Sequence, residues 1–275
     1  RFDPSGEEIG EAYQADCINS WAKSGFDPAT INSAEEYLET GGAMDTLRRI
    51  VLTRDARDKT GRPLLYLRDF LNAIAEDRPG PVAIVNADIY LDIPEEFQKR
   101  LAELKPGEAS FLHRVDTRRP GSHAGSLYRD GLDFFAFHTE DLKSIDTGEM
   151  VLGMPWWDHL LPILLLANGV ERVVPEQSDI VFHYKHDERW DGEAWIAYGN
   201  MFRSMILDLS ERPHSDRAAD YFSAFDDLVT GSNKPFLARM KTQWRGLRRR
   251  RRKARRARQL TRIADANVSF IGTTG

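Results

Sequence analysis

The feature that most constrains this fold is the apolar run that begins at Pro81, is rich in β-branched residues and continues to Leu91. Such a run is typical of a strand buried on both faces of a parallel sheet. Because side chains alternate along a strand, Asn86 and Asp88 are predicted to project to the same side. Ligands of open α/β sheets bind beyond the carboxyl ends of the strands, where this pair would lie. A carboxylate beside an amide oxygen suits a hard divalent cation, and such a cation commonly holds substrate phosphates.

Strand-like and helix-like patterns alternate along most of the chain. The predicted helices span 6–24, a segment from Ser33, 64–75, 94–104, 159–170 and 194–209. The predicted strands span 26–32, 50–52, 81–91, 109–115, 132–138 and 180–184, and a polar loop spans 55–63. This alternation predicts an α/β fold, specifically a Rossmann-like three-layer α/β/α sandwich.

Charge is distributed unevenly along the chain. Of its 38 Lys and Arg residues, 13 lie between Arg239 and Arg262, where no acidic residue occurs. The remainder therefore carries 25 basic residues against 43 acidic ones, although the net charge of the whole chain is −5. Three parts are predicted: a main domain over 1–232, a basic helical extension over 233–266 and a strand over 267–275.

The basic extension has several possible partners. An anionic membrane surface or an acidic partner would bind it electrostatically. It lacks interleaved aromatic residues, so no sequence-specific nucleic-acid binding is expected. The alternative is a solvated helix that only leads to the last strand.

The segment Asn267–Gly275 reads as a further buried strand with a polar, glycine-containing exit. A nucleotide-binding α/β fold normally opens with such a strand, whereas this chain opens on a loop and a helix. We therefore hypothesise that the C-terminal strand occupies the first-strand position. Circular permutation or exchange with a second copy would bring it there.

Composition also bears on the compartment. No apolar run approaches the roughly 20 residues that a membrane span requires. The sequence shows no signal peptide and does not start with Met, which suggests trimming. The single cysteine, Cys17, excludes an internal disulfide framework and fits a reducing compartment. We expect a cytoplasmic protein, which the basic extension could also hold at the inner face of a membrane.

Several short motifs occur in an order that resembles bacterial glycosyltransferases of the GT-A fold, and the resemblance covers most of residues 1–190. The motifs include Gln14, Ser20-Trp21, Gly25-Phe26, Ile31-Asn32-Ser33, Glu35-Glu36, Asn86-Ala87-Asp88-Ile89, Phe134-Phe135-Ala136-Phe137, Gly153-Met154-Pro155-Trp156-Trp157-Asp158 and His183-Tyr184-Lys185-His186-Asp187. The resemblance implies a nucleotide-sugar donor, Mn²⁺ or Mg²⁺, a saccharide or glycolipid acceptor, and a role in envelope polysaccharide synthesis.

The resemblance also implies metal ligands. In the family an Asp-x-Asp element holds the metal that bridges the donor diphosphate, and here its first position is Asn86. Asp88 is therefore the predicted primary ligand, and Asn86 a contact to the donor or to water. A late histidine supplies a further ligand in the family, which here is His183 or its competitor His186. The alternatives are that Asn86 and Asp88 only form a turn and that the histidine is structural.

Asp158 matches the family's acidic position at the start of a helix that faces the acceptor. In inverting members this carboxylate is the general base for the attacking hydroxyl, while its alternative role is that of a helix N-cap. Predicted donor contacts are Asn32, Arg62 and, if the C-terminal strand takes the first position, Thr273. For Arg62 the alternative is an ordinary solvated arginine.

Two other functions compete with glycosyl transfer. A nucleotidyltransferase would share the sheet and the metal, but it should show a glycine-rich signature with a basic residue after the first strand, which this sequence lacks. A catalytically inactive binding or scaffold domain would use the basic extension to hold anionic partners.

Overall fold

The computed structural model describes residues 7–39, 42–128, 131–172, 179–185 and 192–210. The chain divides into two compact units, one formed by 1–128 and 132–190 and the other by 129–131 and 191–275. In the second unit the structure describes one helix, α7 (Gly192–Ser210), which confirms the helix predicted over 194–209. The predicted basic extension over 233–266 and the C-terminal strand over 267–275 lie outside the described residues.

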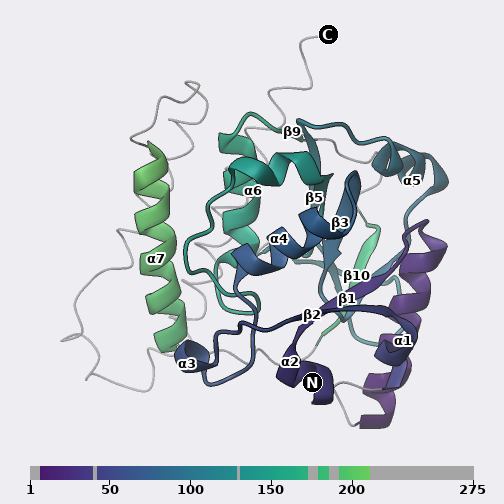
Figure 1. Cartoon of the computed structure of the whole chain (residues 1–275). Helices are drawn as coiled ribbons and strands as arrows, with labels where there is room; N and C mark the ends of the chain where they lie inside the picture. The colour runs from purple at the N-terminus through teal and green to yellow at the C-terminus, as the bar shows by residue number, and fades with distance from the viewer. Residues whose placement is uncertain (1–6, 40–41, 129–130, 173–178, 186–191, 211–275) are drawn as a thin grey trace, which may run out of the picture. The chain divides into compact units, whose positions relative to one another are not determined.

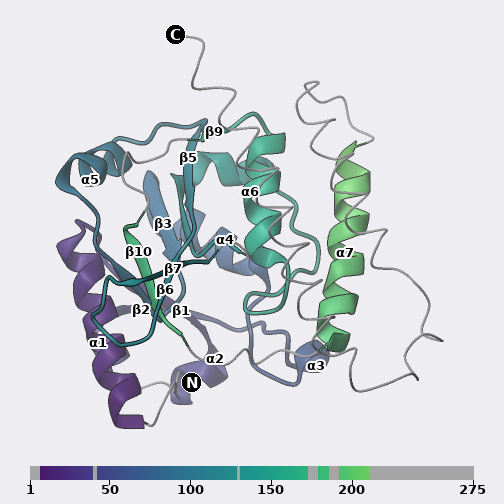
Figure 2. The ribbon, with the colours of Figure 1, turned by 180° about the vertical axis from the view of Figure 1, so that it is seen from behind.

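Helices and strands alternate along the first unit, and this confirms the predicted α/β class (Figure 1; Figure 2 shows it from behind). Its helices are α1 (Glu7–Lys23), α2 (Ala34–Glu39), α3 (Arg57–Thr60), α4 (Leu67–Asp77), α5 (Glu95–Ala102) and α6 (Trp157–Ala167), with 3-10 turns η1 (Gly42–Thr46) and η2 (Thr139–Ser144). Its strands are β1 (Ala29–Ser33), β2 (Arg48–Leu52), β3 (Pro81–Val85), β4 (Ile89–Leu91), β5 (Glu108–Leu112), β6 (Val115–Thr117), β7 (Gly125–Leu127), β8 (Phe134–His138), β9 (Glu171–Arg172) and β10 (Val181–Tyr184).

The described strands form three sheets. One is the parallel pair β1-β2, and the others have the orders β3-β8-β5-β9 and β4-β10-β6-β7. Strand β8 is antiparallel to both β3 and β5, while β10 is parallel to β6 and antiparallel to β4. The two four-stranded sheets therefore contain both parallel and antiparallel pairs. Strand β3 pairs only in the antiparallel direction among the described strands, so the parallel sheet predicted around it is wrong.

Two predicted strands are each divided between two sheets. The run predicted as one strand over 81–91 stops at Val85, and a turn closed by the bond from the Ile89 N–H to the Asn86 carbonyl (3.1 Å) leads into β4. The strand predicted over 109–115 likewise becomes β5 and β6. Asparagine and aspartate favour turns because their side chains bond to nearby backbone, and this preference interrupts the first run.

The core lies on both faces of β8. Phe134 and Ala136 belong to a buried cluster with side chains of α1 and α5, including Tyr13 and Phe97. Phe135, which lies between them in the strand, faces α6, where its ring lies 5.2 Å from that of Trp157. A strand buried on both faces between helical layers is the centre of an α/β sandwich.

Helix α1 ends where the sequence predicts. Gly25 has a φ of 84°, a conformation that glycine adopts without steric cost. The Gly25 N–H donates to the Ala22 carbonyl (3.0 Å) and the Phe26 N–H to the Trp21 carbonyl (3.1 Å). These two bonds form a Schellman motif, which satisfies carbonyls of the last helical turn. In the described part of the chain, no helix has the length and apolar character to cross a membrane.

Candidate metal and donor site

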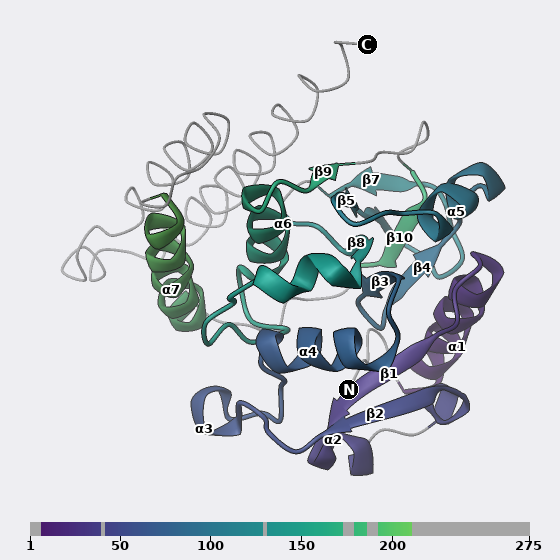
Figure 3. The same ribbon diagram turned by 45° about the horizontal axis from the view of Figure 1, so that its top comes forward.

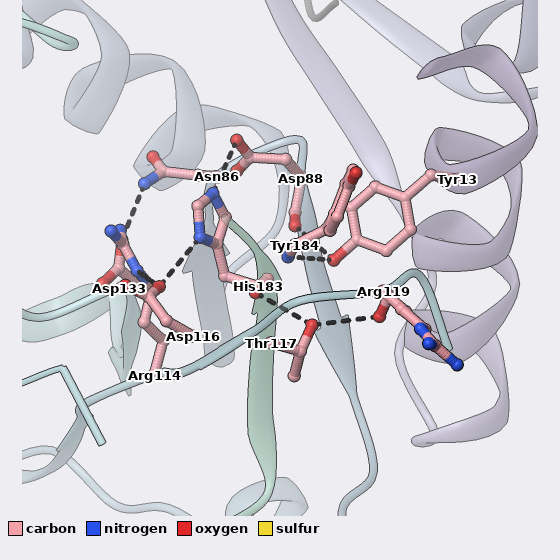
Figure 4. A network of polar contacts seen from close by, with 10 residues as sticks. All are labelled: Tyr13, Asn86, Asp88, Arg114, Asp116, Thr117, Arg119, Asp133, His183 and Tyr184. Carbon is pink, nitrogen blue, oxygen red and sulfur yellow. Dashed lines mark hydrogen bonds and ion pairs between the residues drawn. The ribbon is translucent and has the colours of Figure 1, made fainter. Parts of the chain in front are cut away.

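Helix α1 fixes the turn that carries Asp88. The Tyr13 hydroxyl donates to the backbone carbonyl of Asp88 (3.0 Å) and accepts from the backbone N–H of Tyr184 (3.0 Å). The indole of Trp21 donates to the Ile89 carbonyl (2.6 Å). Burial raises the pKa of Tyr13, so its hydroxyl keeps the proton that it donates. The turn and the end of β10 are thus both tied to one helix face (Figure 4).

His183 lies between two carboxylates. Its Nδ1 is 3.0 Å from Asp116 Oδ1, and its Nε2 is 3.4 Å from Asp88 Oδ2 (Figure 4). The His183 side chain is 5% exposed and that of Asp88 is 17% exposed. Burial lowers the pKa of His183, but hydrogen bonds to Asp116 and Asp88 outweigh it and raise the pKa above the usual value.

Arg114 connects Asp116, and through it His183, to a third carboxylate, that of Asp133. Its Nε lies 2.8 Å from Asp116 Oδ1, and one terminal nitrogen lies 2.8 Å from Asp133 Oδ1. The Asn86 amide also donates to Asp133 Oδ1 (3.1 Å), while Asp133 Oδ2 is buried with no hydrogen-bond partner among the described residues. Burial disfavours the charged form of Arg114, but the charges of Asp133 and Asp116 outweigh it and raise its pKa.

Asp158 lies in the first turn of α6. The N-cap position is Trp156, which has a φ of 81° and makes no side-chain capping bond, so Asp158 is not the N-cap. Trp156 is the one non-glycine residue with positive φ in the part of the chain that the structure describes. Such a backbone conformation is costly for a bulky residue and is found preferentially at functional sites. It sets the direction from which α6 begins.

The electrostatic surroundings of Asp158 link it to the same network. Its side chain is 25% exposed, and its Oδ2 lies 4.0 Å from His159 Nε2. Burial raises the pKa of Asp158; the charge of Asp133 adds to the rise, while His159 and Arg114 oppose it. A carboxylate with a raised pKa is a stronger base than an ordinary exposed aspartate.

A divalent cation fits the donor atoms of Asp88 and His183. The described residues contain no group of three or more His, Cys, Asp or Glu side chains that could hold a metal by itself. A site built on these two would complete its coordination with substrate phosphates and water, as Mg²⁺ and Mn²⁺ sites in transferases do. Asp116 holds Nδ1 of His183, which is the outer-sphere contact that orients a metal-binding imidazole.

The other predicted contacts are Asn32, Arg62, His186 and Thr273. Asn32 is the penultimate residue of β1 and is 7% exposed. Its side chain accepts a bond from the Thr30 hydroxyl (3.0 Å), and it lines a cavity of about 1000 Å³ that Asn86 also lines. Arg62 is exposed in the loop after α3, and the cavity lining does not include it. His186 and Thr273 lie outside the described residues, so the choice between His183 and His186 stays a prediction.

Sequence reasoning did not assign four residues that complete the network, namely Tyr13, Arg114, Asp116 and Asp133. A signal was present for two of them. Arg114 and Asp116 alternate directly after an apolar strand, which is the pattern of side chains that share one face at a strand end. Asp133 precedes the aromatic run of β8 and carries no signal of its own.

Comparisons with known proteins leave the family undetermined. Neither protein-family models nor curated proteins match this sequence. Among solved structures, the chain is similar to one described as the crystal structure of HddC from Yersinia pseudotuberculosis complexed with GMP-PN. The identity is 10%, the match covers 74% of this chain and 94% of that chain, and the TM-score is 0.29. A score this low supports no argument about function.

Proposed function

We propose that this protein is a metal-dependent glycosyltransferase of the GT-A type, which moves a sugar from a nucleotide-sugar donor to a hydroxyl of a saccharide-type acceptor. The observation that carries the proposal is the convergence of Asp88 Oδ2 and His183 Nε2, which are 3.4 Å apart, beside a second carboxylate, Asp116, that orients the histidine. Asp88 lies in the turn before β4, whereas His183 lies on β10, the neighbour of β4 in the same sheet, 95 positions further along the sequence. Asp158, whose raised pKa suits a base, is electrostatically coupled to the same network.

The roles of the metal-binding residues follow from their chemistry. Asp88 and His183 would hold Mn²⁺ or Mg²⁺ on the diphosphate of the donor. When bound, the cation stabilises the negative charge that develops on the diphosphate as the glycosidic bond breaks. With its Nδ1 proton held by Asp116, His183 would bind the cation through Nε2, beside the carboxylate of Asp88. Tyr13 fixes the backbone of Asp88, which limits how far the carboxylate can move.

Asp158 has the second role. Its ionised carboxylate would accept the proton of the acceptor hydroxyl as that oxygen attacks the anomeric carbon of the donor. The Asn86 amide nitrogen donates to Asp133. Its amide oxygen, which replaces the first carboxylate of the Asp-x-Asp element, would contact the nucleotide-sugar donor.

Nucleotide binding tests the proposal first. Thermal unfolding of the wild-type chain is measured with UDP and with GDP, each with and without Mn²⁺. We expect one nucleotide to raise the melting temperature only when Mn²⁺ is present, and Asp88→Asn to remove that rise. Asp92→Asn is the matched control, because Asp92 follows β4 closely but is 61% exposed. An equal response of the two variants, or no Mn²⁺-dependent response, contradicts the assignment of Asp88.

Product analysis tests the reaction type. With a nucleotide sugar that stabilises the protein, glycosyl transfer releases a nucleoside diphosphate and leaves the anomeric carbon bonded to the acceptor. A nucleotidyltransferase instead forms or consumes pyrophosphate. Detection of pyrophosphate exchange without release of nucleoside diphosphate would refute glycosyl transfer while retaining the metal site.

A further inference from the structure

Two strands of the first unit each have one edge without a strand neighbour among the described residues. Strand β1 pairs with β2, and β3 pairs with β8, and the described strands include no partner for the opposite edge of either (Figure 3). Such an edge presents unpaired backbone N–H and C=O groups to whatever lies beside it. Both edges border the same cavity of about 1000 Å³.

The residues that line this cavity show that it runs along the edges of two strands, where a further strand could pair. Consecutive residues line it on both sides, 29–32 of β1 and 81–85 of β3. Successive side chains of a strand point to opposite faces, so a cavity that touches every residue lies beside the strand edge and not on one face. We call this cavity between β1 and β3 the edge slot.

Apolar side chains of helical elements contribute to the lining of the edge slot, beside charged ones such as Glu36 and Arg48. Trp21 of α1 and Met44 of η1 contribute to its lining, as do Phe70 and Ile74 of α4. These side chains come from different helical elements around the sheet. An extended segment placed in the slot would bury alternate side chains among them, and its backbone would complete the hydrogen bonding of both edges. A segment with that environment is expected to be a continuous apolar run.

We propose that the edge slot is the docking site of the segment Asn267–Gly275 of this same chain. That segment contains Val268-Ser269-Phe270-Ile271, which combines β-branched and aromatic residues without a charge. The remaining undescribed sequence is charged, interrupted by proline or only two residues long. The apolar run and its flanking Asn267 match the five residues of β1 and of β3 in length.

The chain is long enough for this contact. The 56 residues from 211 to 266 separate α7 from the segment, and an extended chain spans roughly 3.3 Å per residue, or about 180 Å. In an orientation parallel to β1, the polar exit of the segment places Thr273 at the end of the slot where Asn32 lies. Docking would therefore also complete the donor side of the cavity.

Disulfide trapping in the full-length chain tests the docking. Ala83 of β3 is replaced by cysteine together with Val268, Ser269 or Phe270, in three separate double variants that also carry Cys17→Ala. The control pairs Val51→Cys, on the exposed side of β2, with Ser269→Cys. Under mild oxidation we expect a disulfide within one chain for at least one slot pair and none for the control.

The possible results distinguish docking of the chain's own segment from docking of the segment of a second copy. A disulfide between two chains overturns docking within one chain and assigns the slot to the segment of a second copy. Absence of a disulfide in all three slot pairs, or an equal yield in the control, overturns the proposal. As a second readout, Phe270→Asp should lower the melting temperature by several degrees, whereas Asn267→Asp should not. Neither measurement requires catalysis, so a failure here is distinct from a failure of the proposed function.

Discussion

Replacing Arg114 by methionine tests whether the buried charge network has the energetic weight that its geometry implies. The Arg114 side chain is 19% exposed, and its partners Asp116 and Asp133 are 10% and 5% exposed. Removing one partner of a buried ion pair typically costs about 3 to 5 kcal/mol, because the remaining charge is left uncompensated. Asp116 keeps its contact with His183 and Asp133 keeps that with Asn86, so we expect a loss near the lower limit, about 3 kcal/mol.

The assay is urea unfolding followed by tryptophan fluorescence at pH 7. Arg100→Met is the matched control, since Arg100 pairs with Glu108 at 2.6 Å but is 40% exposed, and exposed pairs contribute about 0 to 1 kcal/mol. The Arg114→Met deficit should shrink when Asp133→Asn is added, because the second change removes the uncompensated carboxylate. If Arg114→Met costs less than about 1 kcal/mol, or no more than Arg100→Met, the network does not carry the energy assigned to it.

Two further substitutions test the proposed chemistry. Asp116→Asn should weaken Mn²⁺ affinity, measured by titration with the stabilising nucleotide, by about 10- to 100-fold, because the orienting contact to His183 is weakened; an unchanged affinity contradicts that role. Asp158→Asn should lower kcat by at least about 100-fold without lowering the melting temperature, because the amide removes a carboxylate that burial makes costly. In the wild type, kcat/KM should fall as pH drops through the Asp158 pKa, which lies above the usual aspartate value. A profile that is flat through that range excludes Asp158 as the base.

The local signals in the sequence were sufficient to predict the type of most elements. The helix predicted from Ser33 begins at Ala34, where the Ser33 hydroxyl accepts a bond from the Glu36 N–H (3.1 Å), and α1 ends at Lys23, next to the predicted boundary at residue 24. Helix α6 and strand β10 follow their apolar runs. These features depend on interactions within a few residues, which a single sequence displays directly.

The division of strands among sheets was not predictable in this way. Residues 81–91 contain enough β-branched residues for one long strand, and the turn preference of Asn86 and Asp88 becomes a break because the two halves pair with different strands. Strand β3 pairs with β8, whereas β4 pairs with β10, so the chain must turn at Asn86 to reach the second sheet. Which strands become partners depends on sequence separations of about 50 to 100 residues, and no periodic pattern encodes that choice.

The same reasoning explains why the site was predicted only in part. Asp88 and His183 were named from the resemblance, whereas Arg114 and Asp133 acquire a role only because the fold places them beside Asp116. The network contains four carboxylates, those of Asp88, Asp116, Asp133 and Asp158, against one permanent cation. Hydrogen bonds to Asp116 and Asp88 raise the pKa of His183, and under the proposed function the same carboxylates would favour a divalent cation at this site. We therefore expect the proposed cation binding to depend on the whole network and not on an Asp-x-Asp element alone, which would allow one carboxylate in that motif to suffice.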